Sequence, residues 1–253
     1  MNTGNEQFDD SIDYEKAARS YDDVRTGNVE MMEILVDILS PHSGSLVLDV
    51  GCGTGNNTRL FAQLTRTQIV GLDLSHEMLR KAASKLSDST LIRGEASALP
   101  FRNETFEYAF MTEVIHHLPK KDLAVKNLQD IMKSRGRICI VTQSHKQIEE
   151  RMTSRFFPST VTVDQKRYPR IYALKQLLSE VGFKGVRSIE RKLSPIEQSS
   201  DFLECVEKKG YSMLRKISAS EYETGLRKIR QTLNKQKSPI YVPAYTFIYA
   251  TKP

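Results

Sequence analysis

A glycine-rich turn with an acid in front of it is the first part of the chain that could bind a ligand. The run from Leu48 to Asn56 reads LDVGCGTGN, with glycines at positions 51, 53 and 55. Glycines let a chain turn sharply from a strand into a helix and let a ligand approach the backbone closely. A dinucleotide site needs Gly-x-Gly-x-x-Gly, but position 56 is Asn. Asp49 would also repel a pyrophosphate, so the turn argues against a dinucleotide.

Further short motifs occur in order along the chain. Asp73 ends a second predicted strand in the run GLDLS, residues 71–75. GEASALPF follows at 94–101, and EVIHHL at 113–118 comes after a fourth predicted strand. Upstream, Tyr21 and Arg25 belong to a YDxxR run. Together these motifs resemble those of class I S-adenosylmethionine-dependent methyltransferases, of the small-molecule type that includes ubiquinone and menaquinone biosynthesis enzymes (methyltransferase type 11).

The resemblance implies S-adenosyl-L-methionine as the cofactor and S-adenosyl-L-homocysteine as its product. It places Asp73 on the ribose hydroxyls, Asp49 at the methionine end, and Glu95, where the family usually has Asp, on the adenine amino group. The other cofactor contacts that it implies are Tyr21, Arg25, Gly51, Gly53, Gly55, Asn56, Leu74, Ala96 and Thr112. Taken alone, Asp73 could instead be a carboxylate at a helix N-terminus, and Asp49 could cap neighbouring backbone amides.

Histidines mark the expected acceptor side. Ligands in open α/β sheets bind beyond the carboxyl ends of the strands, and His116, His117 and His145 follow the fourth and fifth predicted strands. A neutral imidazole can remove a proton from a methyl acceptor. Adjacent residues on a helix point about 100° apart, so we expect one of His116 and His117 to pack structurally. No acid or cysteine has metal-ligand spacing beside them, and no metal is predicted.

Arginines and aromatic residues alternate after the fifth predicted strand. Arg151, Arg170 and Tyr172 could hold an anionic or planar acceptor, since a guanidinium group matches carboxylate and phosphate geometry. The alternative is a solvated loop anchored by a few aromatic side chains.

The predicted elements that position these residues alternate between strands and helices. This order indicates an α/β fold with a Rossmann-like, mostly parallel seven-stranded sheet, helices on both faces and an antiparallel last strand. We expect N-terminal helices over the cofactor site at 1–43, a methyltransferase core at 44–190 with a substrate loop at 144–169, a helical cap insertion at 191–242 and a closing strand at 243–253.

Composition and charge limit the localisation and the function classes that the chain could have. The 253 residues carry a net charge of +6, but residues 1–43 have three basic and ten acidic side chains. The sequence shows no secretory signal and no apolar run of membrane-spanning length, and its three separated cysteines suggest a cytoplasmic protein. The main interpretation is methyl transfer to a small-molecule acceptor at O, N or an acidic C, possibly an anionic one. The alternatives are an RNA or protein methyltransferase on the same core and a non-catalytic cofactor-binding homologue, and a nucleic-acid partner is disfavoured.

Overall fold

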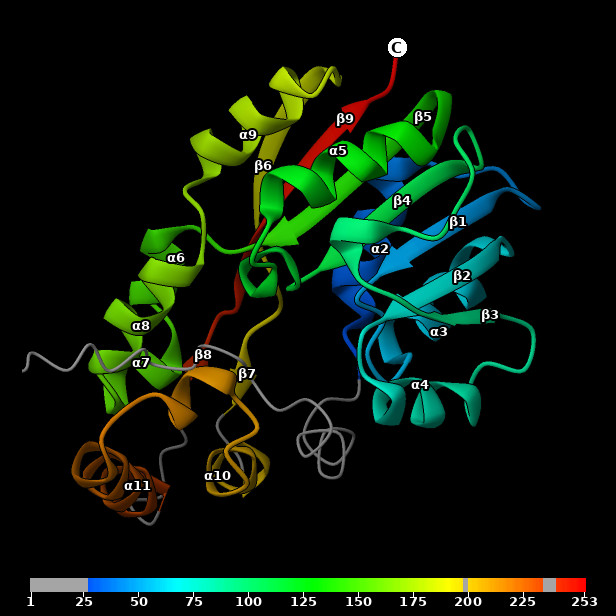
Figure 1. Ribbon diagram of the computed structural model, residues 1–253. Helices are drawn as coiled ribbons and strands as arrows, with labels where there is room; N and C mark the ends of the chain where they lie inside the picture. The colour runs from blue at the N-terminus through cyan, green and yellow to red at the C-terminus, as the bar shows by residue number, and fades with distance from the viewer. Residues whose placement is uncertain (1–26, 198–199, 234–239) are drawn as a thin grey trace, which may run out of the picture.

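The computed structural model describes residues 27–197, 200–233 and 240–253 (Figure 1). Its central feature is a seven-stranded sheet with the order β3-β2-β1-β4-β5-β9-β6. The strands are β1 (Leu46–Val50), β2 (Gln68–Asp73), β3 (Thr90–Arg93), β4 (Phe106–Thr112), β5 (Met132–Thr142), β6 (Lys184–Lys192) and β9 (Ala244–Thr251). β9 runs antiparallel between β5 and β6, and the other strand pairings of this sheet are parallel. This confirms the predicted sheet and its antiparallel last strand.

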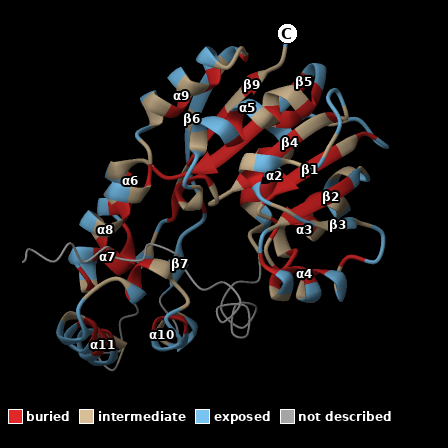
Figure 2. Cartoon of the chain, viewed as in Figure 1, coloured by how far each residue is buried: buried red, intermediate tan, exposed pale blue. Residues whose placement is uncertain are grey.

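Helices cover both faces of the sheet, as the sequence predicts. On one face α2 (Val29–Leu39) and α3 (Asn56–Thr65) pack apolar residues such as Met32 and Phe61 against the sheet. On the other face α5 (Lys121–Ile131) and α9 (Ile171–Glu180) contribute Leu128 and Leu178 to a second core. α4 (His76–Ala83) lies beside β2 and β3. Figure 2 shows the buried residues concentrated along the strands and the inward faces of these helices.

The segment at 144–169, expected as a long loop, is helical. It forms α6 (His145–Glu149), α7 (Met152–Phe156) and α8 (Ser159–Arg167). α6 begins with a capping box, in which the Ser144 side chain accepts from the Gln147 backbone and the Gln147 side chain accepts from the Ser144 backbone. Because α6 and α7 have only five residues each, neither is long enough to show an apolar helical period.

The inserted segment between β6 and β9 is mainly helical. It contains β7 (Ile196–Glu197), α10 (Ser200–Glu207), the 3-10 turn η3 (Ser212–Arg215), α11 (Ala219–Leu233) and β8 (Ile240–Tyr241). Its own apolar core includes Phe157 of the α7–α8 segment, beside Val206, Leu214 and Ile229. Gly225 allows this contact, because a Cβ there would lie 2.2 Å from Phe157 Cε1. The insertion is therefore packed onto α6–α8 rather than onto the sheet.

Candidate active site

The glycine-rich turn is a left-handed loop tied to the end of β2. Gly51, Gly53 and Gly55 have φ values of +76°, +55° and +78°. The backbone N–H groups of Gly51 and Cys52 both donate to the Leu72 carbonyl, at 2.7 and 3.0 Å. A Cβ on Gly51 would meet Val114, and one on Gly55 would meet Leu86. At Gly53, in contrast, no described atom lies within 4 Å of a Cβ, so the backbone there faces open space.

Asp73 closes this loop from the end of β2. Its Oδ2 accepts a hydrogen bond from the Gly53 backbone N–H at 2.8 Å, and its Oδ1 accepts one from the Ser75 N–H at 2.9 Å. Both bonds fix the carboxylate beside the open backbone of Gly53. A fixed carboxylate at the end of β2 is suited to accepting hydrogen bonds from a pair of hydroxyls.

Asp49 is buried at the end of β1 with a carboxylate that is only half satisfied. Its Oδ2 accepts from the Thr58 hydroxyl at 2.7 Å, whereas its Oδ1 has no hydrogen-bond partner among the described residues. Burial raises the pKa of Asp49 to about 7; the charge of Asp73 adds to the rise and the Thr58 hydrogen bond opposes it. The orphaned oxygen therefore fits a ligand, such as a cationic group, that would satisfy it.

The remaining predicted cofactor residues surround these two acids. Asn56 accepts from Lys85 Nζ at 2.8 Å, and the Thr112 hydroxyl accepts from Asn57 Nδ2 at 3.2 Å. The segments after β2 and β3 are adjacent, since Asp73 pairs with Arg93. Leu74 is 61% exposed there, Glu95 is exposed and Ala96 is buried. Tyr21 and Arg25 lie outside the described residues.

His116 and His117 lie side by side, unlike the divergent pair expected on a helix. They belong to a 3-10 turn, η2 (Ile115–His117), and their ring centroids are 3.9 Å apart. His116 is only 6% exposed, and its ring stacks on Tyr168. His145 contacts the backbone of the same tyrosine, with Nε2 2.9 Å from the Tyr168 carbonyl oxygen. That nitrogen is the donor of this bond, so His145 orients the Tyr168 backbone.

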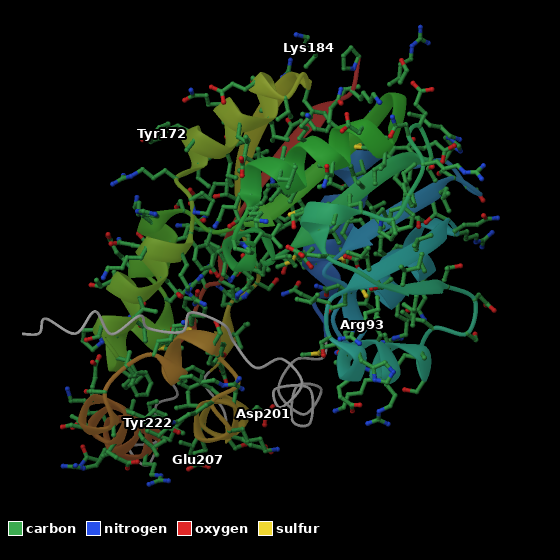
Figure 3. The ribbon with its side chains drawn as sticks, viewed as in Figure 1. Arg93, Tyr172, Lys184, Asp201, Glu207 and Tyr222 are labelled. Carbon is green, nitrogen blue, oxygen red and sulfur yellow. The ribbon has the colours of Figure 1, made fainter. Side chains whose placement is uncertain are left out.

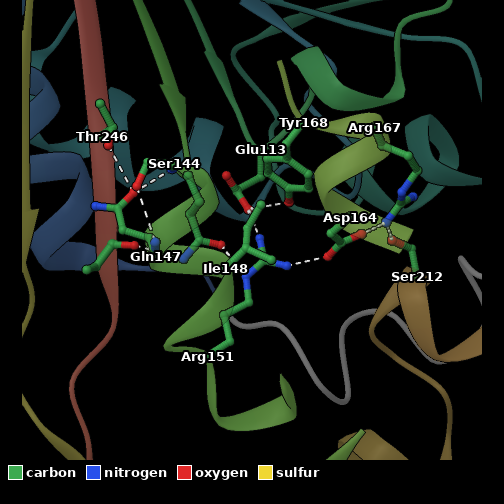
Figure 4. A network of polar contacts seen from close by, with 12 residues as sticks. Glu113, Ser144, Gln147, Ile148, Arg151, Asp164, Arg167, Tyr168, Ser212 and Thr246 are labelled. Carbon is green, nitrogen blue, oxygen red and sulfur yellow. Dashed lines mark hydrogen bonds and ion pairs between the residues drawn. The ribbon is translucent and has the colours of Figure 1, made fainter. Parts of the chain in front are cut away.

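A buried polar network joins the sheet to α6–α8 (Figure 4). Arg151 donates through Nε to Gln143 at 2.7 Å and through Nη1 to Asp164, and its Nη2 lies 3.9 Å from Glu113 Oε2. The Tyr168 hydroxyl donates to the same Glu113 oxygen at 3.0 Å. The Arg151 guanidinium also lies 4.9 Å from the centre of the Tyr168 ring. Glu113, directly after β4, is thus held by two groups from the helical segment.

The network fixes the charge states of its members. Burial raises the pKa of Tyr168 well above its usual value, so its hydroxyl keeps the proton that it donates to Glu113. Burial disfavours the charged form of Arg151, but the neighbouring groups of Tyr168, Asp164 and Glu113 outweigh it and raise the pKa of that arginine. A permanently charged arginine and a protonated tyrosine therefore face the carboxylate after β4.

Comparison with known proteins identifies the core. Residues 48–140 match the family model for a methyltransferase domain. The chain carries a class I S-adenosylmethionine-dependent methyltransferase domain. S-adenosyl-L-methionine is the cofactor of this class, and the match spans the Gly-rich turn, Asp73 and the histidine pair.

Relatives and solved structures agree with this methyltransferase assignment. A malonyl-[acyl-carrier protein] O-methyltransferase from Hamiltonella defensa is 26% identical over 190 residues, covering 71% of this chain and 73% of the relative. A ubiquinone/menaquinone biosynthesis C-methyltransferase from Saccharophagus degradans is 28% identical over 141 residues, 51% of this chain and 57% of the relative. A crystal structure of a methyltransferase from an antibiotic biosynthesis pathway of Anabaena variabilis has the same fold, with a TM-score of 0.74, 19% identity and coverage of 90% and 99%.

The substrate residues predicted for this methyltransferase are placed differently from the expectation. Arg151 is buried and bound to Asp164 and Gln143, rather than exposed on a loop. Arg170 is exposed just before α9, and Tyr172 is 67% exposed and points away from the sheet (Figure 3). The structure thus brings Arg151 to the site but does not bring Tyr172 there.

No site role was predicted from the sequence for three residues of this network, namely Glu113, Asp164 and Tyr168. Glu113 offered a signal, because it directly follows the fourth predicted strand. The structure adds that it has a φ of +57°, which is uncommon for a residue other than glycine. Asp164 and Tyr168 offered none, since their partners lie on other elements. Two absences hold within the described part of the chain: no cluster of three His, Cys, Asp or Glu residues could hold a metal, and no helix is long and apolar enough to cross a membrane.

Proposed function

We propose that this methyltransferase transfers the methyl group of S-adenosyl-L-methionine to a small-molecule acceptor held between the end of β4 and helices α6–α8. The observation that carries the proposal is the buried network of Glu113, Arg151 and Tyr168, which lies one strand away from the Asp49 and Gly53 loop. The cofactor supplies an electrophilic methyl group on a sulfonium. The protein must hold donor and acceptor in line and remove a proton where the acceptor carries one.

The proposed cofactor site rests on three features, each of which could contact bound S-adenosyl-L-methionine. Gly53 offers open backbone, Asp49 offers a buried oxygen without a partner among the described residues, and Asp73 offers a fixed carboxylate. Asp73 would accept hydrogen bonds from the ribose hydroxyls, and Asp49 would face the methionine end. Glu95, Leu74 and Ala96, which follow β2 and β3, would surround the adenine.

His116 is our candidate for the proton acceptor, with His117 beside it as the second choice. An imidazole close to neutral pH can take a proton from an O–H, N–H or acidic C–H group. Tyr168 keeps the His116 ring in one orientation, and His145 in turn holds the Tyr168 backbone. His145 therefore acts in this proposal as a positioning residue.

The acceptor in this proposal carries an anionic group. Three arginines, Arg151, Arg155 and Arg167, belong to the α6–α8 segment that faces the histidines. One relative is named for a malonyl group, which contains a carboxylate. Because Arg151 already donates to Gln143 and Asp164 and its Nη2 faces Glu113, we assign the contact with the acceptor to a different arginine of this segment.

The test is incubation of the purified protein with a metabolite extract and a methyl-labelled donor. We expect a labelled small molecule with wild type and with the surface variant Asp88→Ala, and none with Asp73→Ala. Label that persists with Asp73→Ala would refute the cofactor site. If the label is found in a macromolecule that ribonuclease or protease degrades, the acceptor is an RNA or a protein instead.

A further inference from the structure

Arg167, at the end of α8, is a buried cation with unused hydrogen-bond donors. Its side chain is 9% exposed. Nη2 donates to Asp164 and, at 3.1 Å, to the Ser212 hydroxyl of the inserted segment. Nε and Nη1 are buried and have no hydrogen-bond partner among the described residues.

Arg151 provides the comparison within the same cluster. It is equally buried and binds the same carboxylate, Asp164. Its Nε and Nη1 both donate hydrogen bonds, to Gln143 and Asp164, and its Nη2 faces Glu113. Asp164 is therefore already neutralised by a well-satisfied arginine, and Arg167 is not needed for that purpose.

The cost of this arrangement indicates a missing partner. Leaving a buried charged donor without an acceptor destabilises the folded protein. A structural arginine would be expected to fold with its donors satisfied, as Arg151 does. Arg167 instead retains donors suited to a carboxylate or phosphate, which guanidinium groups bind in preference to other ligands.

The position of Arg167 connects it to the acceptor side of the site. Asp164 links it to Arg151, and Arg151 faces Glu113 at the end of β4. The next residue, Tyr168, carries the ring that stacks on His116. Ser212, from η3, adds a hydroxyl to the same position.

We propose that Arg167 binds the anionic group of the methyl acceptor, a carboxylate or a phosphate, and that Ser212 supports it. This inference rests on the proposed function and names its specificity-determining residue. Asp164 weakens the attraction for a second anion, but it is shared by two guanidinium groups. An acceptor with one anionic group would fill the donors that Arg167 leaves open.

The experiment measures anion binding to the protein saturated with S-adenosyl-L-homocysteine. Sodium phosphate and sodium malonate are titrated separately by calorimetry, at an ionic strength held constant with sodium chloride. We expect one of the two to bind wild type. Arg167→Lys should weaken that binding about tenfold, since lysine lacks the planar fork, and Ser212→Ala about threefold.

Arg227→Ala is the matched control, since it removes an exposed arginine of α11 that is not part of the Asp164 cluster. It should bind the anion as wild type does. Preference for malonate or for phosphate assigns the acceptor's group. Equal anion binding in wild type, Arg167→Lys and Ser212→Ala, or no anion binding in wild type, would overturn the inference. S-adenosyl-L-homocysteine binding is measured first in every variant, and its absence in wild type would overturn the proposed function instead.

Discussion

The imidazole of His116 lies flat on the phenol ring of Tyr168, with ring centroids 3.7 Å apart and planes 13° apart. His116 comes from the turn after β4, and Tyr168 caps the end of α8. The contact therefore joins the turn after β4 to the helical segment. Stacking at this distance restricts the imidazole to one orientation.

Tyr168 variants separate the stack from the hydroxyl. Tyr168→Phe keeps the ring on His116 but removes the donor to Glu113, and should lower the free energy of unfolding by about 1 kcal/mol. Tyr168→Leu removes both the hydroxyl and the ring that stacks on His116. Its kcat should therefore be lower than that of Tyr168→Phe, while its affinity for S-adenosyl-L-homocysteine should be unchanged. Urea unfolding and initial rates of methyl transfer check both effects. Equal rates in the two variants would show that the stack does not position His116.

Asp164 is predicted to be the most sensitive residue of the network. Asp164→Ala leaves two buried guanidinium groups without their shared carboxylate and should destabilise the protein by about 3–5 kcal/mol. Asp88→Ala, an exposed acid in a turn, should change stability by less than about 0.5 kcal/mol. Urea unfolding of both variants checks this, and similar values for the two would mean that the ion pairs do not hold α8 in place.

The raised pKa of Asp49 predicts that the stability of the protein depends on pH. Its folded pKa, about 7, is higher than its usual value of 3.8. Between these values the folded protein holds a proton that the unfolded chain has released, so this group's contribution to stability falls as pH rises from about 4 to about 7. Asp49→Asn cannot ionise and should lack this fall.

Urea unfolding of both proteins at pH 5, 6, 7 and 8 measures the difference. Wild type should lose stability relative to Asp49→Asn as the pH increases. A difference that is constant with pH would show that Asp49 does not titrate in this range.

Some of these features could be predicted from the sequence because they depend on local pattern. The sheet follows from alternating apolar strands and helices, and the loop before α3 from glycines at 51, 53 and 55. The α6–α8 layer could not, since five-residue helices show no period. The burial of Arg151 could not be predicted either. Its partner Asp164 lies thirteen residues away and pairs with it only after two helices pack together.

The histidine pair shows the same limit at a shorter range. Treating residues 116 and 117 as helical predicts rings that point about 100° apart. The turn is 3-10 instead, which by itself would separate adjacent side chains by about 120°. The first ring stacks on Tyr168, which comes from a separate element that the local sequence pattern does not include. The sequence pattern therefore placed the two histidines after β4 but could not predict the orientation of their side chains.

Glycines in the loop should divide into structural and ligand-facing positions. Gly51→Ala places a Cβ 2.4 Å from Val114 Cγ2 and should destabilise the fold by roughly 1–3 kcal/mol. In Gly53→Ala the added Cβ meets no described atom within 4 Å. This variant should lose only about 1–2 kcal/mol of stability, because alanine disfavours the left-handed backbone conformation. If the cofactor lies against Gly53, however, the added methyl group should weaken S-adenosyl-L-homocysteine binding about tenfold.

Gly44→Ala is the matched control for Gly53→Ala. Gly44 also has a positive φ, +79°, and also faces open space, but it lies before β1, away from the carboxyl ends of the strands. Both variants should lose similar stability in urea unfolding, because both force alanine into the left-handed region. Calorimetry should then show weaker S-adenosyl-L-homocysteine binding for Gly53→Ala alone. Unchanged affinity in Gly53→Ala would remove Gly53 from the cofactor site.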